Sequence, residues 1–501
     1  MTTAMERARA AAEERLLEAE LATVLGHRRA AIPSSPRPRP WLAAAIVLLG
    51  LGAVIGTWWL RREPPGAAQD PAPAPLPDAV HADRTRDLAG LPVDVHHLAC
   101  RLDGPADLAE LARLQQLRRL VVLAYDPKAA AGRLRGVLDG VVGVHRGWAA
   151  PAPGTLLPLA SLPRLESLAL PSQLAVDGAQ LAALRSARAL RELSVGAAAV
   201  VDDTFAERLA ALPALRALEL REVPLDAAAV TLLERVGLRE LRLQSCPGVG
   251  ESALRALAAL SSLEALELEG VGRPSLGHAP ADAAAAAVTP LAGPSLEGLR
   301  RLPRLRSVRF HGCVLDDTAL AALPDRIEEL WLSSASGFTA EGLQSLQSLP
   351  RLRVLRFRER SGYGLLENHR IPPEQAADAL AEVLEGVRLR ECSFTGVPTP
   401  RLVEALAAQP ELTQLSLSSM VGDHSALDLA PLGRSPSLEH LSLLNQPHLG
   451  DEDLRPLAAC RTLRSLRAHA CGRITAAAAT ALLPGVEVVV VPLDGPRGET
   501  K

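Results

Sequence analysis

Aromatic residues are scarce in this chain of 501 residues, at 2% against an apolar content of 48%. The apolar residues are therefore mostly leucine, alanine and valine, which favours many small, similar layers over one large aromatic-rich core. A charge excess is also missing, because 54 basic and 57 acidic residues leave a formal charge of −3. We therefore expect no binding to nucleic acid through bulk attraction.

Lysine, cysteine and catalytic motifs are rare or missing as well. Lys128 and Lys501 are the only lysines, so arginine carries almost all of the positive charge, as is typical of GC-rich coding. Six cysteines in this length do not make a disulfide scaffold. The sequence has no G-x-x-x-x-G-K-[ST], no H-E-x-x-H and no G-x-S-x-G motif. We therefore expect no enzyme, no cofactor and no metal site.

One long uncharged run stands near the N-terminus. Residues 41–60 read WLAAAIVLLGLGAVIGTWWL, and as a helix they would match the roughly 30 Å hydrocarbon core of a bilayer. Trp41 marks one end and Trp58 with Trp59 the other, where indoles favour the headgroup level. A buried helix of a soluble protein is the alternative. The run predicts a single transmembrane helix over 41–60, and its Gly52 and Gly56 form a G-x-x-x-G pair that would permit a homodimer.

The charges that flank this run suggest a topology. Four arginines lie in the twenty residues before it and two in the twenty after it: Arg28, Arg29, Arg37 and Arg39, then Arg61 and Arg62. The positive-inside rule then favours a cytoplasmic N-terminus and an extracytoplasmic C-terminal part. Because forty residues precede the run, a signal anchor fits better than a cleaved signal peptide. We expect a cytoplasmic tail with a short helix over 1–40 and a proline-rich linker over 61–92.

An internal repeat fills the rest of the chain. The spacing apolar-x-x-apolar-x-apolar places alternate side chains on one face of a short strand. Between these strands, segments such as 202–215 return apolar residues every three to four positions, as a helix does. Each unit alone would leave apolar surface in water, so neighbouring units must stack. The spacing begins at Leu117, Leu165, Leu190, Leu215, Leu238, Leu263, Leu305, Ile327, Leu352, Leu384, Leu412, Leu438 and Leu463.

With these motifs the chain resembles the leucine-rich repeat family, in the cysteine-containing, ribonuclease-inhibitor-like type with a helical convex side. The resemblance covers residues 93–495 and leaves a tail at 496–501. It implies an α/β solenoid with parallel strands on the concave side. It further implies that the slot three positions after the third apolar residue points inward and bonds the turn backbone. Four cysteines match that slot: Cys246, Cys313, Cys392 and Cys471.

In this family the concave strand face commonly binds protein partners. Arginines gather there around one tryptophan, and both residue types are enriched among binding hot spots. The alternative is that arginine simply fills polar positions and that Trp331 stacks on a neighbouring arginine. Two insertions, 272–295 and 359–375, add candidate contact loops. The predicted contact residues are Arg309, His311, Trp331, Arg356, Arg358, Arg388 and Arg390.

The sequence therefore favours a binding protein with a single membrane span in a bacterial inner or cell membrane. Its extracytoplasmic repeat domain would bind a protein, or an anionic component of the envelope, on the concave face. Two alternatives stay open. One is a membrane-tethered scaffold or receptor that faces the cytosol. The other is a structural protein of the envelope whose solenoid only bridges space.

Overall fold

The computed structural model describes residues 80–82, 88, 90–102, 105–125, 156–171, 174, 176–196, 201–271, 290–358, 371–419 and 427–491. The chain divides into two units, residues 1–76 and 77–501, and every described residue lies in the second. Several predictions therefore concern residues that are not described: the tail 1–40, the apolar run 41–60 with Gly52 and Gly56, and the tail 496–501. Most of the linker and most of the two insertions also lie outside the described residues. In the part that is described, no helix is both long and apolar enough for a membrane crossing.

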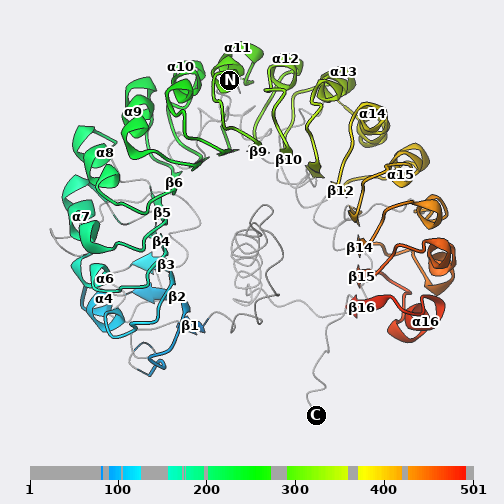
Figure 1. Ribbon diagram of the computed structural model, residues 1–501, viewed down its shortest axis with the longest axis horizontal. Coiled ribbons are helices and arrows are strands. Elements are labelled where there is room, and N and C mark those ends of the chain that lie inside the picture. Colours follow the sequence, from blue (N-terminus) through cyan, green and yellow to red (C-terminus); the bar gives the residue numbers. More distant parts are fainter. Residues whose placement is uncertain are drawn as a thin grey trace, which may run out of the picture. The chain divides into compact units, whose positions relative to one another are not determined.

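A single parallel sheet runs through the repeat unit. The sixteen strands of the described residues pair in the order in which they occur in the chain, so strands adjacent in the sheet are consecutive in sequence (Figure 1). The predicted α/β solenoid of parallel strands is confirmed. The strands are β1 (Val80–Ala82), β2 (His97–Leu102), β3 (Arg119–Tyr125), β4 (Ser167–Ala169), β5 (Glu192–Val195), β6 (Ala217–Arg221), β7 (Glu240–Gln244), β8 (Ala265–Glu269), β9 (Ser307–His311), β10 (Glu329–Ser333), β11 (Val354–Arg358), β12 (Glu391–Thr395), β13 (Gln414–Ser418), β14 (His440–Leu444), β15 (Ser465–His469) and β16 (Glu487–Val491).

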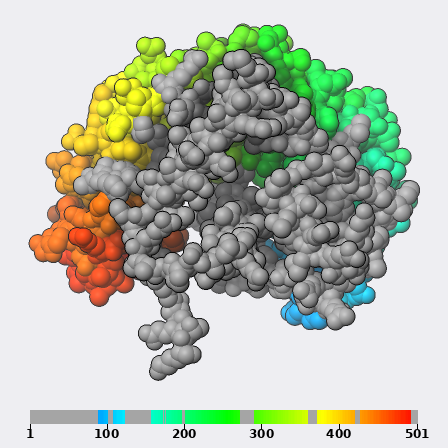
Figure 2. Space-filling model, turned by 180° about the vertical axis from the view of Figure 1, so that it is seen from behind, coloured from blue at the N-terminus to red at the C-terminus, as the bar shows by residue number. Residues whose placement is uncertain are grey.

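Helices connect the strands and cover the outer side of the curve, while the strands line its inner side (Figure 1). Seen from behind, consecutive repeats follow one another in sequence order (Figure 2). The α-helices are α4 (Pro105–Leu111), α6 (Leu157–Ala160), α7 (Gly178–Ala182), α8 (Asp203–Ala210), α9 (Ala227–Leu232), α10 (Glu251–Ala256), α11 (Gly293–Arg300), α12 (Asp317–Ala321), α13 (Ala340–Gln344), α14 (Pro373–Gly386), α15 (Pro400–Ala407) and α16 (Ala476–Leu482). The 3₁₀ helices are η2 (Ala183–Ser186), η3 (Leu233–Val236), η4 (Leu257–Ala259), η6 (Ser345–Ser348), η7 (Pro431–Arg434) and η8 (Asp451–Ala459).

The apolar spacing sets the register of the strands. In β6 to β8 the equivalent residues Leu218, Leu241 and Leu266 pair side by side, and all three are buried. The residues between the leucines, such as Glu219 and Arg242, face the other side of the sheet and are partly exposed. Each repeat thus adds one layer of leucine to a continuous core, which is why no large aromatic cluster is needed.

Three of the four predicted ladder cysteines bond the neighbouring repeat. The thiol of Cys246 donates to the Leu220 carbonyl at 3.1 Å, and that of Cys313 donates to the Leu268 carbonyl at 3.1 Å. Cys471 makes the same bond to Leu443 at 3.4 Å. Each of these buried thiols thus has a carbonyl acceptor in an adjacent repeat.

The prediction for Cys392 is wrong. Cys392 lies within β12 and pairs with Leu355, so it points into the core as the second apolar residue of its repeat. The repeat begins at Leu389, not at Leu384, because α14 runs on to Gly386 and includes Leu384. Burial raises the pKa of the thiols of Cys246 and Cys392 to about 12.

The sheet extends beyond the predicted repeat domain at its N-terminal end. β1 pairs in parallel with β2 through Val80 and Leu98, so the first strand precedes residue 93. At the other end, β16 leaves one edge of the sheet without a neighbouring strand among the described residues. Val489 and Val491 on this strand are 41% and 42% exposed.

Candidate functional site

The strands β8 to β12 form the central part of the concave face. Their outward side chains come from the first, third and fifth positions of each five-residue strand. Strand pairing places Trp331 of β10 directly between Arg309 of β9 and Arg356 of β11. The same pairing places Ser333 between His311 and Arg358. Five of the seven predicted contact residues therefore lie together on three adjacent strands.

Trp331 is held between two arginines. The guanidinium carbon of Arg309 lies 4.1 Å from the centroid of the indole ring, and that of Arg356 lies 4.3 Å from it. These distances allow a cation–π contact on each face of the ring. The indole N–H of Trp331 has no hydrogen-bond partner within the described part of the chain. The ring is thus fixed in orientation, and its N–H is itself buried rather than presented to solvent.

Arg309 belongs to a row of alternating charges that crosses four strands, β7 to β10. Its Nη2 lies 3.2 Å from Glu329, and its Nη1 lies 3.9 Å from Glu267. Glu267 in turn lies 3.5 Å from Nε of Arg242, which also donates to Glu240 at 2.9 Å. The side chain of Glu267 is only 6% exposed and that of Arg309 only 13%. These arginines are largely neutralised by their acidic neighbours, so they do not form a bare basic patch.

The charged state of Arg242 is favoured by this row. Burial acts against the charge, but the attraction of Glu240, Glu267 and Glu219 outweighs it, and the pKa of Arg242 is raised above its ordinary value. Arg242 therefore keeps its positive charge next to these carboxylates. The row gives the concave face fixed charges of both signs.

On the other side of the tryptophan, the pattern of pairing changes. Arg356 forms an ion pair with Glu391, and both side chains are partly exposed. Arg358 is the next outward residue of β11, two positions after Arg356. It is exposed, and its side chain has no partner among the described residues. Of the arginines on β9 to β11, Arg358 is thus the one most available to a ligand.

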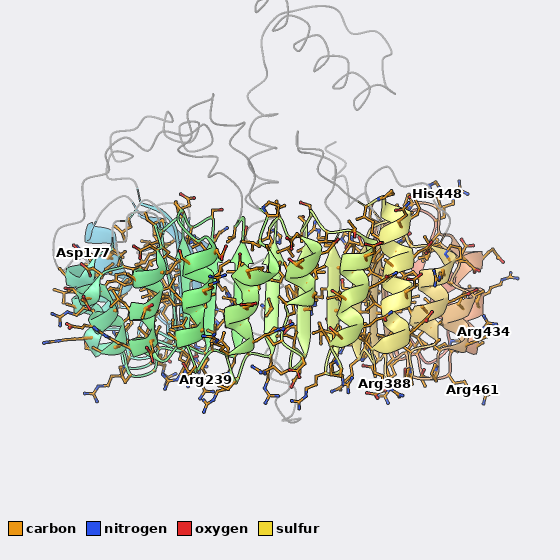
Figure 3. The ribbon with its side chains drawn as sticks, turned by 90° about the horizontal axis from the view of Figure 1, so that it is seen from above. Asp177, Arg239, Arg388, Arg434, His448 and Arg461 are labelled. Atoms are coloured by element: carbon orange, nitrogen blue, oxygen red, sulfur yellow. The ribbon has the colours of Figure 1, made fainter. Side chains whose placement is uncertain are left out.

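Arg388 and Arg390 do not belong to this site. β12 presents Ser393 and Thr395 beside Arg356 and Arg358, in the positions that the sequence assigned to the two arginines. Arg388 and Arg390 precede the strand in the connection from α14, and both are exposed. Figure 3 shows Arg388 along one margin of the repeat unit, together with Arg239 and Arg461. The prediction was wrong because the Leu384 spacing belongs to α14, whereas the strand follows the spacing of Leu389.

The acidic partners were missed in the sequence. Glu240, Glu329 and Glu391 occupy the first position of their strands, one residue before a buried leucine or cysteine. The sequence does contain a signal for them: in ELRL, ELWL and ECSF a glutamate directly precedes the first inward residue of the strand. β13 and β14 present Ser416 and Ser442 at the equivalent outward position, in line with Ser393 of β12. The concave face therefore changes from charged to uncharged and polar next to Arg356.

No set of three or more histidine, cysteine, aspartate or glutamate side chains in the described residues is arranged to hold a metal ion. All six cysteines are buried, and none of them is part of a disulfide bond. The arrangement on the concave face supports contact with another molecule through an oriented ring, paired charges and exposed Arg358.

No protein-family model matches the chain, and no curated protein matches it. Solved structures that it resembles include an internalin of Listeria monocytogenes, at 15% identity over 69% of this chain and 72% of that one, with a TM-score of 0.31. A leucine-rich repeat protein of Leptospira interrogans is 14% identical over 79% of this chain and 90% of that one, with a TM-score of 0.33. TLR13, solved in a complex with ssRNA13, is 16% identical over 81% of this chain and 57% of that one, with a TM-score of 0.36. The assignment of the solenoid fold rests on the strand register and not on these similarities.

Proposed function

We propose that this protein is a membrane-anchored binding protein that captures a protein partner on its concave face, centred on Trp331. The observation that carries this proposal is the clamp of Arg309 and Arg356 on both faces of the indole ring. A ring held in one orientation loses little conformational freedom when a partner covers it, and tryptophan and arginine are the residues that most often dominate binding energy.

The chemistry around the ring favours a protein over a simple polyanion as the partner. Arg309 and Arg356 already have carboxylate partners, so an anion would compete with Glu329 and Glu391 for them. A protein surface offers what the site leaves open, namely a carboxylate for the exposed guanidinium group of Arg358. The hydroxyl groups of Ser393 and Ser416 lie beside this centre and add further hydrogen-bonding groups.

Site-specific photo-crosslinking tests the surface. A photo-reactive residue in place of Ser393, beside the clamp, should capture a partner from cell envelopes, while the same residue in place of Glu404 on α15 should not. Capture from Ser393 should be lost when Trp331→Ala and Arg358→Ala are combined. Equal capture from both positions, or capture that survives the double change, would exclude the concave centre as the binding surface. No capture at all would favour a structural protein of the envelope.

The membrane part of the proposal rests on the apolar run 41–60 and its flanking arginines. A reporter active only outside the cytoplasm, fused to the C-terminus, should be active. If only a reporter that works inside is active, the repeat unit faces the cytosol and the protein is a tethered scaffold. Crosslinking between copies that depends on Gly52 and Gly56 would support the proposed helix dimer.

A further inference from the structure

Arginines are concentrated on one edge of the repeat unit, where helices end and strands begin. We call the fourteen segments that lead from a helix to the next strand the arginine edge, because they contain no lysine and far more arginines than acids. The acidic residues of this edge are Glu166, Glu264, Asp325, Glu328, Glu411 and Glu439. Its arginines are Arg113, Arg118, Arg164, Arg188, Arg191, Arg216, Arg239, Arg301, Arg304, Arg306, Arg326, Arg351, Arg353, Arg388, Arg390, Arg461 and Arg464.

On the opposite edge, where strands end and helices begin, the described residues include more acids than arginines. Arg473 is the one arginine in the described parts of its connections. In Figure 3, Asp177 and His448 lie along this margin, while Arg239, Arg388 and Arg461 lie along the other. The acids of the described strand-to-helix connections are Asp177, Asp202, Glu222, Asp226, Asp316 and Asp428.

The helix dipole accounts for part of this asymmetry. Acidic residues favour helix N-termini and basic residues favour helix C-termini. Some arginines of the edge also donate to backbone carbonyls of a neighbouring repeat: Arg326 bonds Arg300 at 3.1 Å, and Arg353 bonds Arg388 at 2.9 Å. These side chains have a structural role.

Other arginines of the edge have no such role. Arg301, Arg304, Arg351, Arg388 and Arg390 are all exposed. No hydrogen bond or ion pair of their side chains occurs within the described part of the chain. They come from three separate connections, those that lead to β9, β11 and β12. Folding does not require these charges, so the edge is suited to contact an external anion.

The edge is also uninterrupted and lies at one level. Because all strands are parallel and pair in register, every strand begins at the same margin of the sheet (Figure 3). Each gap in the described residues between β2 and β16 follows a strand, so all fourteen connections of the arginine edge are described in full. Exposed arginines at one level on a curved unit match a planar anionic surface, whereas a thread-like polyanion would meet only a few of them at once.

The chain enters the repeat unit from this same edge. β1 runs parallel to β2, so Val80 lies at the margin where strands begin. Residues 61–79 connect the apolar run to Val80, and covalent geometry limits their span to about 60 Å. Residues 61–79 are therefore joined to the described part of the chain at the arginine edge.

We propose that the arginine edge lies against an anionic phospholipid bilayer and orients the solenoid with its opposite edge away from the membrane. The inference rests on the proposed membrane anchor for bringing a bilayer within reach. Basic residues near an anionic leaflet are attracted to it within about one Debye length, which is about 8 Å at physiological salt. In this orientation the concave face stands upright on the membrane and stays open to a partner.

The test measures how close each edge lies to the lipid. The full chain is reconstituted into vesicles of phosphatidylcholine alone or with phosphatidylglycerol, and the lipid headgroups carry an energy-transfer acceptor. A donor dye is attached to Ser261→Cys on the arginine edge or to Pro224→Cys on the opposite edge; the native cysteines are buried and should not react. We expect at least twofold higher transfer from Ser261→Cys in the anionic vesicles, lost at 1 M salt.

Two matched variants assign the effect. Changing Arg301, Arg304, Arg351 and Arg388 to glutamine should abolish the extra transfer. The same change at four exposed arginines of the helical side, Arg208, Arg235, Arg255 and Arg401, should leave it intact, although the net charge is equal. Equal transfer from both edges, or equal loss in both variants, would overturn the proposal. Displacement from anionic vesicles by an oligonucleotide at matched charge concentration would also overturn it, in favour of a linear polyanion.

A second measurement distinguishes a failure of the proposed membrane anchor from a failure of the proposed contact at the arginine edge. Resistance of the full chain to alkaline extraction from phosphatidylcholine vesicles depends on the apolar run, because those lipids carry no net charge. Chain that is extracted from those vesicles, but still shows arginine-dependent transfer in anionic ones, would disprove the anchor and retain the edge. Chain that stays embedded but gives equal transfer from both edges would retain the anchor and disprove the edge.

Discussion

The guanidinium group of Arg309 and the indole ring of Trp331 lie face to face on neighbouring strands, with 4.1 Å between the guanidinium carbon and the ring centroid. Arg356 covers the other face of the ring at 4.3 Å. Arg309 is in turn held by Glu329 and Glu267. The carboxylates therefore position the arginine, and the arginine positions the ring.

The clamp on Trp331 should be measurable in the folded protein. A cation–π contact at a partly exposed site contributes about 0.5–1 kcal/mol. We expect the double-mutant cycle of Trp331→Leu and Arg309→Gln to give a coupling energy of that size in denaturant unfolding. Trp331→Phe should retain part of it. A coupling of zero would mean that the stacked geometry contributes nothing to stability.

Glu267 should be the acid on this face on which stability depends most. Its side chain is nearly buried between Arg242 and Arg309, so Glu267→Gln leaves two largely buried arginines with fewer acceptors. We expect the free energy of unfolding to fall by about 2–3 kcal/mol. Glu264→Gln is the control, because its pair with Arg239 is exposed and should change stability by less than about 0.5 kcal/mol.

The buried thiols should make stability fall at high pH. The pKa of a thiol in an unfolded chain is about 8.5, but burial raises the pKa of Cys246 and Cys392 to about 12. The contribution of the two thiols to the free energy of unfolding is therefore fully present below the pKa of the unfolded chain. It is lost as the pH rises from there towards 12. Few lysines and tyrosines titrate in this range, since the chain has two of each.

The measurement is chemical denaturation between pH 8 and 11 with the native chain and with the Cys246→Ala, Cys392→Ala double variant. The native chain should lose stability more steeply with pH than the variant. Identical slopes would show that the two thiols do not remain protonated in the fold.

Two glycines with positive φ should differ in their tolerance of alanine. Gly337 has φ +99°, and an added Cβ would lie 2.5 Å from the Leu315 carbonyl oxygen. Gly237 has φ +67° with no atom within 4 Å of an added Cβ. We expect Gly237→Ala to cost about 1 kcal/mol through conformation alone. Gly337→Ala should lower the free energy of unfolding by about 2 kcal/mol more than this, because its Cβ would also collide with the Leu315 carbonyl. Thermal or denaturant unfolding measures both changes.

Partner capture should depend on the observed strand register and not on the predicted one. Once a partner is identified, Arg358→Ala should weaken binding about tenfold or more, as expected for an exposed arginine at the centre of an interface. Changing Arg388 and Arg390 to alanine together should leave the affinity unchanged, because neither lies on the concave face. Titration calorimetry with both variants decides between the registers. Weaker binding by the Arg388, Arg390 variant would place the contact at the strand-start edge instead.

Much of the fold could be predicted because the apolar spacing is local. Within one repeat, Leu263, Leu266 and Leu268 determine which side of the strand is buried, and the same rule identifies Trp331 and Arg356 as outward residues. The rule failed at β12, where two overlapping spacings begin at Leu384 and Leu389. Helix α14 takes the first and the strand takes the second, and a local pattern contains nothing that decides between them.

The sequence by itself determined the parallel α/β solenoid, the inward side of most strands and the place of three ladder cysteines, because each depends on contacts within one repeat or with its equivalent in the next. The tertiary structure alone decided which charges meet. Arg356 pairs with Glu391, 35 positions away, and Arg242 reaches Glu267 on the next strand. Such pairs depend on how neighbouring strands align, and the connections between those strands differ in length. The same alignment brings arginines from separate repeats together on one edge.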